Sequence, residues 1–125
     1  MERKEVIELS ERFLEAWNTQ DVETVIACYT PDLEFRDPNT KGTVNGADAM
    51  RRYLKKLFDN WQMHWSLREA YPFSDTDGEA VLWHATLRKE GTDKTVVIDG
   101  MDLVLIENGL IKRNEVNFDR VPLVI

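Results

Sequence analysis

The chain has 125 residues, of which 42% are hydrophobic and 31% are charged, a profile typical of one soluble globular domain spanning residues 1–125. Its net charge of -7 disfavours a nucleic-acid partner, because phosphate backbones attract basic surfaces. No apolar stretch reaches membrane-spanning length, and the N-terminus lacks the uninterrupted apolar core of a signal peptide. The lone cysteine, Cys28, excludes an internal disulfide, so we expect a reducing, cytoplasmic compartment.

Three helices are expected in the first half of the chain. Apolar residues recur at three- and four-residue spacing up to about Asn18, which predicts a helix with one apolar face. Asp21 is a typical N-cap for a second helix, whose inner face would include Tyr29 and which Pro31 would end. After Asn45-Gly46, apolar residues at helical spacing predict a third helix, with this inner face: Met50, Tyr53, Leu54, Leu57, Phe58 and Trp61.

Five strands are expected, the first of them short. Leu33–Asp37 alternates as a strand, and a loop rich in turn-forming residues follows it. After Asn60 the hydrophobic period changes from 3.6 to 2, which predicts a meander with strands at residues 63–72, 79–89, 95–106 and 110–121. Helices segregated from antiparallel strands indicate an α+β domain, in which a twisted sheet curls around the helices and leaves a cavity.

Two carboxylates are in phase with the apolar residues of their strands. Asp102 has the parity of Val104 and Ile106, and Asp37 has that of Leu33 and Phe35. Burying an ionised carboxylate is costly unless it is paired, hydrogen-bonded or protonated. Each of the two aspartates is therefore a candidate for acid or base chemistry in a pocket.

Each aspartate also has a purely structural interpretation. Asp37 would accept hydrogen bonds from the backbone of the turn at residues 39–41. Asp102 would pair with Arg113 or accept a hydrogen bond from a tyrosine, and a bulge at Gly100 would turn it to the other face of the sheet. The sequence leaves both alternatives open.

Three further titratable side chains are weaker candidates. Glu69 has the parity of the inward residues of its strand, but a bulge would leave it in solvent. His64 and His84 lie on neighbouring predicted strands, each opposite in parity to a tryptophan. They could pair, or one could serve as an acid or base, but outward-facing surface positions are expected. No HxH or HExxH spacing occurs, so no metal site is indicated. Hydration or epoxide opening would need a water held beside a carboxylate, to which Asn114 and Asn117 could contribute.

The element order and the phrases YTPDLEFRDP, GTVNGADAMRRYLKKL and ENGLIKRNEVNFDRVPLV resemble the nuclear transport factor 2-like superfamily. Within it, the chain is most similar to the SnoaL-like polyketide cyclases and the ketosteroid isomerases. The resemblance implies a cone-shaped, curved mixed sheet wrapped around three N-terminal helices, with a pocket at the wide end and homodimers through the outer sheet face. This fold hosts several enzyme classes and also non-catalytic binding modules.

The resemblance implies roles for individual residues. Asp37, directly before Pro38, matches the catalytic aspartate at the end of the first strand. Asp102 matches the aspartic acid that stays protonated in ketosteroid isomerase, an arrangement already known for that enzyme. Four aromatic residues are expected to line or support a pocket for a planar ligand: Tyr29, Tyr53, Trp83 and Phe118. Phe13 stands where a tyrosine would donate to the substrate oxygen, and such a donor is worth about 3–4 kcal/mol, which argues against steroid isomerisation itself.

Two hypotheses follow. The first is an enzyme without cofactor or metal that binds a small, largely apolar or polycyclic carbonyl compound. Asp37 would move a proton next to the carbonyl, as in isomerisation or cyclisation, while Asp102, helped through Tyr53, would stabilise the enolate oxygen. The second is a non-catalytic small-molecule-binding or dimerisation module of the same fold, in which both aspartates are structural.

Overall fold

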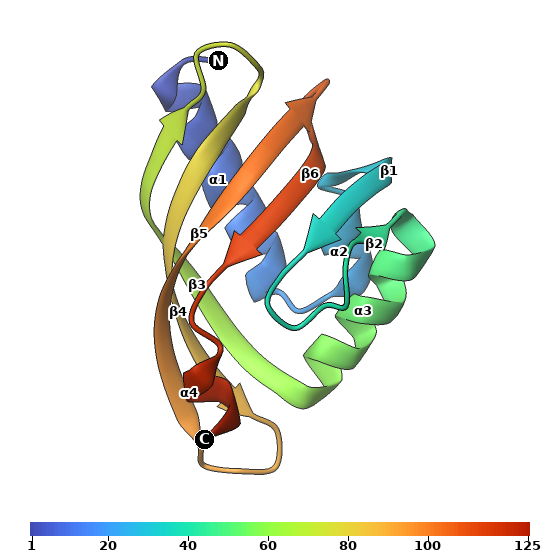
Figure 1. Cartoon of the computed structure of the whole chain (residues 1–125), viewed down its shortest axis with the longest axis vertical. Coiled ribbons are helices and arrows are strands. Elements are labelled where there is room, and N and C mark those ends of the chain that lie inside the picture. The colour runs from blue at the N-terminus through green and yellow to red at the C-terminus, as the bar shows by residue number, and fades with distance from the viewer.

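The computed structural model describes residues 1–125 and contains helices and strands in the predicted classes (Figure 1). The helices are α1 (Arg3–Asn18), α2 (Val22–Ile26), α3 (Ala47–Asn60) and α4 (Val121–Val124). The strands are β1 (Tyr29–Arg36), β2 (Val44–Asn45), β3 (Trp61–Pro72), β4 (Gly78–Lys89), β5 (Thr95–Glu107) and β6 (Leu110–Asn117). None of the helices combines the length and the apolar character that crossing a membrane requires.

One six-stranded sheet organises the chain, with the strands in the order β2-β1-β6-β5-β4-β3. β1 runs parallel to β6 and every other pair is antiparallel, so the sheet is mixed. Figure 1 shows the long strands twisting and curving, with α1 lying against the sheet and α3 beside β1. The predicted α+β class and curved mixed sheet are confirmed.

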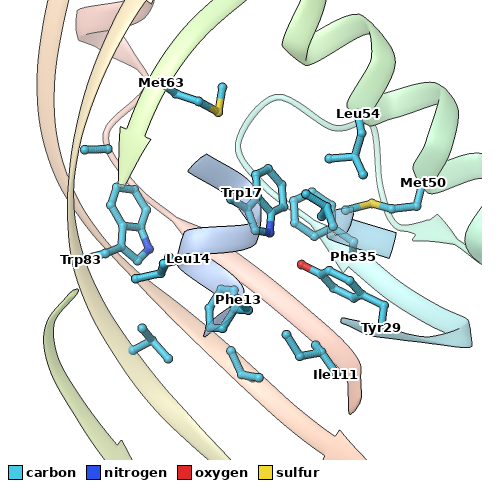
Figure 2. Close-up of a cluster of buried hydrophobic side chains, with 14 of the residues drawn as sticks. Phe13, Leu14, Trp17, Tyr29, Phe35, Met50, Leu54, Met63, Trp83 and Ile111 are labelled. Atoms are coloured by element: carbon cyan, nitrogen blue, oxygen red, sulfur yellow. The ribbon is translucent and has the colours of Figure 1, made fainter. Parts of the chain in front are cut away.

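The core lies between the apolar face of α1 and the inner face of the sheet. Alternation with period two buries one side of β4, where Val81, Trp83, Ala85 and Leu87 are all at most 5% exposed. Figure 2 shows Phe13, Leu14 and Trp17 of α1 among side chains from the strands and α3, and these belong to a cluster of 20 buried hydrophobic residues. Because a fully buried large apolar side chain contributes about 1.5–3 kcal/mol, this cluster fixes how α1 lies on the sheet.

A bulge in β3 decides which side chains of that strand face inward. Its pairing with β4 shifts between Leu67 and Glu69, so Ala70 is buried while Glu69 and Tyr71 are exposed. The expected solvated position of Glu69 is confirmed. Unbroken alternation from Met63 would also place Tyr71 inward, but the extra residue reverses the alternation and Tyr71 is exposed.

Three element boundaries differ from the predicted ones. Tyr29 begins β1 and does not belong to α2, which ends at Ile26. Pro31 lies within β1, where the pairing with β6 is irregular and a missing N–H is tolerated. Trp61 begins β3 although helical spacing assigned it to α3, and Val121 begins a short helix in place of the end of a strand.

The two histidines lie on the outer face of the sheet, as expected, and do not pair with each other. His64 is opposite Thr86, whereas His84 is opposite Ser66 and contacts Asp99 at 2.7 Å. They are therefore remote from the core side of the sheet.

Candidate functional site

A pocket of about 580 Å³, including its open mouth, lies between α1, α3 and the inner face of the sheet. Fourteen of its 18 lining residues are hydrophobic, so it suits a ligand that is itself largely apolar. The other four lining residues are Asp37, Asn39, Asp102 and Asn114. The two aspartates thus reach the same pocket from β5 and from the end of β1.

Aromatic rings form much of the pocket wall. The rings of Trp65 and Trp83 meet edge to face with centroids 4.6 Å apart, and Phe118 meets Trp83 at 6.0 Å. On the helix side, Trp17 lies edge-on to Trp65 at 6.0 Å. The indole N–H of Trp65 is buried without a hydrogen-bond partner, so it is an unused donor at this wall. Flat surfaces of this kind favour a planar ligand.

Asp102 is held from two sides at the inner face of the sheet. Trp83 Nε1 donates to Asp102 Oδ1 at 2.7 Å, and Asn114 Nδ2 donates to Asp102 Oδ2 at 3.1 Å. The β4–β5 register runs without a shift from Gly78 to Arg88, so no bulge at Gly100 turns Asp102 outward. Its side chain is 4% exposed, as its parity predicts.

Gly100 makes the bond from Trp83 to Asp102 possible. Trp83 is directly opposite Gly100, and a Cβ at position 100 would lie 2.3 Å and 2.4 Å from the six-membered ring of the indole. Real Cβ atoms do not approach other heavy atoms so closely. The missing side chain therefore leaves the space in which the indole crosses β5.

The structural interpretation of Asp102 with Arg113 or a tyrosine as direct partner is wrong. Arg113 is exposed and pairs with Glu115 at 2.8 Å. Tyr29 reaches Asp102 only indirectly, because its hydroxyl donates to Asn114 Oδ1 at 2.8 Å. The result is a buried chain of hydrogen bonds from Tyr29 through Asn114 to Asp102.

Burial dominates the acidity of Asp102. Loss of hydration raises its pKa from 3.8 to about 7, the hydrogen bonds from Trp83 and Asn114 oppose this rise, and the charge of Asp37 adds to it. The carboxyl group is thus poised between its neutral and ionised forms near neutral pH. Each carboxyl oxygen of Asp102 accepts one N–H and keeps one lone pair free. A protonated Asp102 can therefore still donate a hydrogen bond to a ligand in the pocket.

Asp37 lies one residue beyond β1, in a turn that satisfies most of its acceptor positions. The backbone N–H groups of Asn39 and Thr40 donate to Oδ1 at 2.7 Å and 3.1 Å, and the Tyr53 hydroxyl donates to Oδ2 in a short hydrogen bond. The turn contacts foreseen in the structural interpretation are therefore present, together with a position in the pocket lining. Because Oδ1 already accepts two hydrogen bonds, Oδ2 is the atom with room for a proton.

The environment of Asp37 favours its neutral form more than water does. Burial raises its pKa, and the hydrogen bonds from Tyr53 and from the Asn39 and Thr40 backbone oppose the rise. Burial and the neighbouring Asp37 charge also raise the pKa of Tyr53 well above its ordinary value, so this phenol remains a donor. Tyr53 therefore donates its hydrogen bond to Asp37, whereas the sequence hypothesis had it support Asp102.

The pocket brings together six of the seven residues selected from the sequence: Phe13, Asp37, Tyr53, Trp83, Asp102 and Phe118. Tyr29 lies behind Asn114 and outside the pocket lining. Phe13 is 3% exposed and presents only a hydrocarbon ring, so no tyrosine hydroxyl is available there.

Sequence reasoning missed several parts of the site. Trp17 and Trp61 recur at helical spacing with other apolar residues, a pattern that indicates core packing, yet both line the pocket. Leu123 of α4 also lines it, and no pattern in the sequence marks so short a helix. Asn114 was considered only as a water ligand, yet it has the parity of Val116 in β6 and of Phe118 just beyond that strand, a signal that marks it as an inward polar residue.

Hydration or epoxide opening could use Asn114 or Asn117 to hold a water, and the two amides differ in their surroundings. Asn114 Nδ2 donates to Asp102 and, at 3.5 Å, to the carbonyl oxygen of Leu103, while its Oδ1 accepts from Tyr29. No donor of this amide remains for a water. Asn117 is exposed and lies outside this pocket, but it lines a neighbouring surface hollow together with Asp37.

Comparison with known proteins identifies the family. The model of the SnoaL-like domain matches residues 10–114. The chain belongs to the SnoaL-like family. A search of curated proteins found no match for this SnoaL-like chain.

Solved structures share the fold of this SnoaL-like protein. A nuclear transport factor 2-like protein of unknown function from Burkholderia pseudomallei has a TM-score of 0.82 at 17% identity, over 96% of this chain and 95% of that one. A ketosteroid isomerase-like protein from Erwinia carotovora atroseptica has a TM-score of 0.74 at 18% identity, over 93% and 95%. SalBIII, an epoxide hydrolase/cyclase-like enzyme of pyran ring formation in the polyether salinomycin, has a TM-score of 0.83 at 18% identity, over 95% and 94%. At such identities the likeness concerns the fold alone.

Proposed function

We propose that this SnoaL-like protein is an enzyme that moves a proton at the carbon next to a carbonyl group of a small, largely apolar and planar compound. The observation that carries the proposal is that Asp37 and Asp102 line one aromatic pocket, each with a pKa raised by burial. Perturbed carboxyl groups that converge on an apolar pocket are typical of acid–base sites.

The two carboxyl groups have different roles in this proposal. Asp37 Oδ2 removes the proton, while Asp102 in its protonated form donates a hydrogen bond to the enolate oxygen. Activity then needs Asp37 ionised and Asp102 neutral. As pH rises, the rate increases while Asp37 loses its proton and decreases once the pH passes the Asp102 pKa of about 7.

The test follows exchange of α-hydrogens by proton NMR in deuterated buffer, with a panel of ketones that includes steroid-like enones. Wild type is expected to catalyse exchange for at least one ketone, and Asp37→Asn to lower that rate by about 10²–10⁴-fold because the base is lost. Asp32→Asn is the matched control, since Asp32 is an exposed carboxylate of β1, the strand that leads to Asp37, and should leave the rate unchanged.

Two outcomes would contradict the proposal. Equal exchange rates in wild type and Asp37→Asn would remove Asp37 from the chemistry. Binding of the ketones without exchange of any of them would favour the alternative, a non-catalytic small-molecule-binding module of the same fold.

We also propose that two copies of the chain associate through the outer face of the sheet. Val97 is 60% exposed and Met101 is 47% exposed there, and Leu82 is directly opposite Met101 on the neighbouring strand. Covering such a patch is favourable because apolar surface leaves water.

Light scattering at micromolar concentration should give the mass of a dimer for wild type and of a monomer for Met101→Lys, because a buried lysine charge opposes association. Glu11→Lys is the control, since Glu11 is exposed on α1, away from the outer face of the sheet. A monomeric wild type would refute the association.

A further inference from the structure

Glu79 is a buried carboxyl group that the proposed chemistry does not use. Its side chain is 0% exposed, on the inner face of β4 and in phase with Val81 and Trp83. Ser10 of α1, also 0% exposed, makes a short hydrogen bond to Oε1, and Oε2 has no partner. A buried carboxyl oxygen without a donor gives little support to a negative charge.

Glu79 lies one diagonal step from Asp102 on the same face of the sheet. Val81 is directly opposite Asp102, and Glu79 is directly opposite Val104. Diagonal neighbours of this kind are about 7–8 Å apart, close enough for two buried charges to repel each other. Two buried carboxyl groups at this spacing therefore oppose each other's ionisation.

No cation offsets this repulsion. The titratable groups that face Asp102 are Glu79 from β4, Asp37 from the end of β1, and Tyr29 of β1 through Asn114. Asp102 is the one titratable group that acts on Glu79, and Ser10 is its one hydrogen-bond partner. None of the groups that shift either carboxyl is an arginine, lysine or histidine.

We propose that Glu79 and Asp102 act as one coupled acid that carries a single negative charge near neutral pH, with Glu79 as a positioning residue for the chemistry of Asp102. Ionised Glu79 keeps Asp102 protonated, and ionised Asp102 keeps Glu79 protonated. The two groups titrate in the same range, since burial raises the pKa of each to about 7. The benefit for catalysis, a larger share of Asp102 in its donor form, rests on the proposed function, whereas the coupling itself does not.

Trp83 provides a direct signal for this coupling. Its indole N–H donates to Asp102 Oδ1, so its ¹⁵N and ¹H shifts follow the ionisation of Asp102 without any substrate. The protein has four tryptophans, and the Trp83 signal is assigned by its absence in Trp83→Phe. The wild-type signal should titrate over a broader pH range than that of a single acid, because two interacting groups share the transition.

Substitution of Glu79 by glutamine removes the second charge while keeping the side-chain length. In Glu79→Gln the Trp83 signal is expected to titrate over a narrower pH range, with its midpoint lower by about one pH unit, while Asp37 continues to act on Asp102 as in wild type. Glu69→Gln is the control, since Glu69 is an exposed carboxylate on the adjacent strand, and should titrate as wild type does. A Trp83 midpoint that is the same in Glu79→Gln and wild type would overturn the coupling.

The reciprocal measurement covers the case in which Glu79→Gln does not fold. With ¹³C-carboxyl-labelled glutamate, the Glu79 signal in Asp102→Asn should titrate at lower pH than in wild type. Coupling between two sites is reciprocal, so the two midpoint shifts should agree in size where both can be measured. An unshifted Glu79 midpoint in Asp102→Asn would equally overturn the proposal.

Turnover separates this proposal from the proposed function. If the exchange reaction is found, its alkaline limb should move to lower pH in Glu79→Gln by the same amount as the Trp83 midpoint. Coupling in the NMR titrations with no exchange of any ketone would uphold the coupled pair and contradict the enzyme. Exchange of a ketone together with unshifted Trp83 and Glu79 titrations would uphold the enzyme and contradict the coupled pair.

Discussion

Gly100 leaves room for the indole of Trp83 to cross β5, and this single absent side chain brings the indole N–H to Asp102. The hydrogen bond from Trp83 to Asp102 therefore depends on a glycine, which has no side chain of its own. Sequence parity placed Asp102 on the inner face. Parity could not show that Gly100 lies opposite Trp83, because it does not give the register between neighbouring strands.

Substitution of Gly100 by alanine should displace the Trp83 ring and weaken its bond to Asp102. We expect a loss of about 1–3 kcal/mol in the free energy of unfolding, because a methyl group is forced into a packed site. The measurement is urea unfolding of wild type and Gly100→Ala.

The Trp83→Phe background is the control for this mechanism. The alanine Cβ would clash with Cζ2 and Cη2 of the indole, atoms that phenylalanine lacks. The cost of Gly100→Ala should therefore be smaller in Trp83→Phe than in wild type, as a double-mutant cycle would show. Equal costs in the two backgrounds would mean that the clash with Trp83 is not the cause.

The residues of the site differ in how far the sequence could reveal them. Asp37 and Asp102 were found because each interrupts an alternating apolar pattern in a strand. Glu79 shares the parity of Val81 and Trp83 and had the same signal, but it is the second residue of its strand, close to a turn, where few neighbours show the alternation. The sequence could not predict that Tyr53 donates to Asp37, because this contact depends on how α3 lies against the end of β1.

At the scale of elements, the long strands and helices were predictable and the short or irregular ones were not. β4 and β5 carry long runs of period two, and the structure has both close to the predicted bounds. The bulge in β3 reverses the alternation, which is why Tyr71 faces outward, whereas Tyr29 begins β1 because α2 ends earlier than expected, at Ile26. Bulges are set by the packing of neighbouring strands and leave no regular mark in the sequence.

The α4 helix depends on tertiary contacts more than on its own sequence. Lys94 donates to the carbonyl oxygen of Leu123 at 3.4 Å, and Arg120 Nε donates to Asn39 Oδ1 at 2.6 Å. A four-residue helix is not stable by itself, since forming its first turn is unfavourable. Its position beside the pocket could therefore be learned only from the fold.

For the whole molecule, the two deeply buried acids should make stability decrease as the pH rises through neutrality. The pKa of Asp102 is raised from 3.8 to about 7 and that of Glu79 from 4.5 to about 7, so the folded protein holds protons that the unfolded chain has already lost. The free energy of unfolding contributed by these groups is fully present below about pH 4 and is lost as the pH passes 7. A tenfold difference in acidity between the folded and unfolded states corresponds to about 1.4 kcal/mol of that free energy.

Urea unfolding at pH 5 and pH 8 should show a lower free energy of unfolding at pH 8. In the double variant Asp102→Asn/Glu79→Gln this difference should shrink, because neither substituted side chain ionises. A wild-type protein that is more stable at pH 8 than at pH 5, or a double variant with the same difference as wild type, would contradict this account.

The two aspartates of the pocket are held by parts of the protein that differ in how freely they can change. Asp102 is fixed by side chains from two strands of the sheet, whereas Asp37 is fixed mainly by the backbone of its own turn and by Tyr53. The loop beyond that turn is largely exposed, and Gly42 has open space around it. Exchanging this loop for one of another length would move Asp37 relative to the pocket while leaving Asp102 in place. The chain thus offers a natural point at which one half of the site can be redesigned without rebuilding the other.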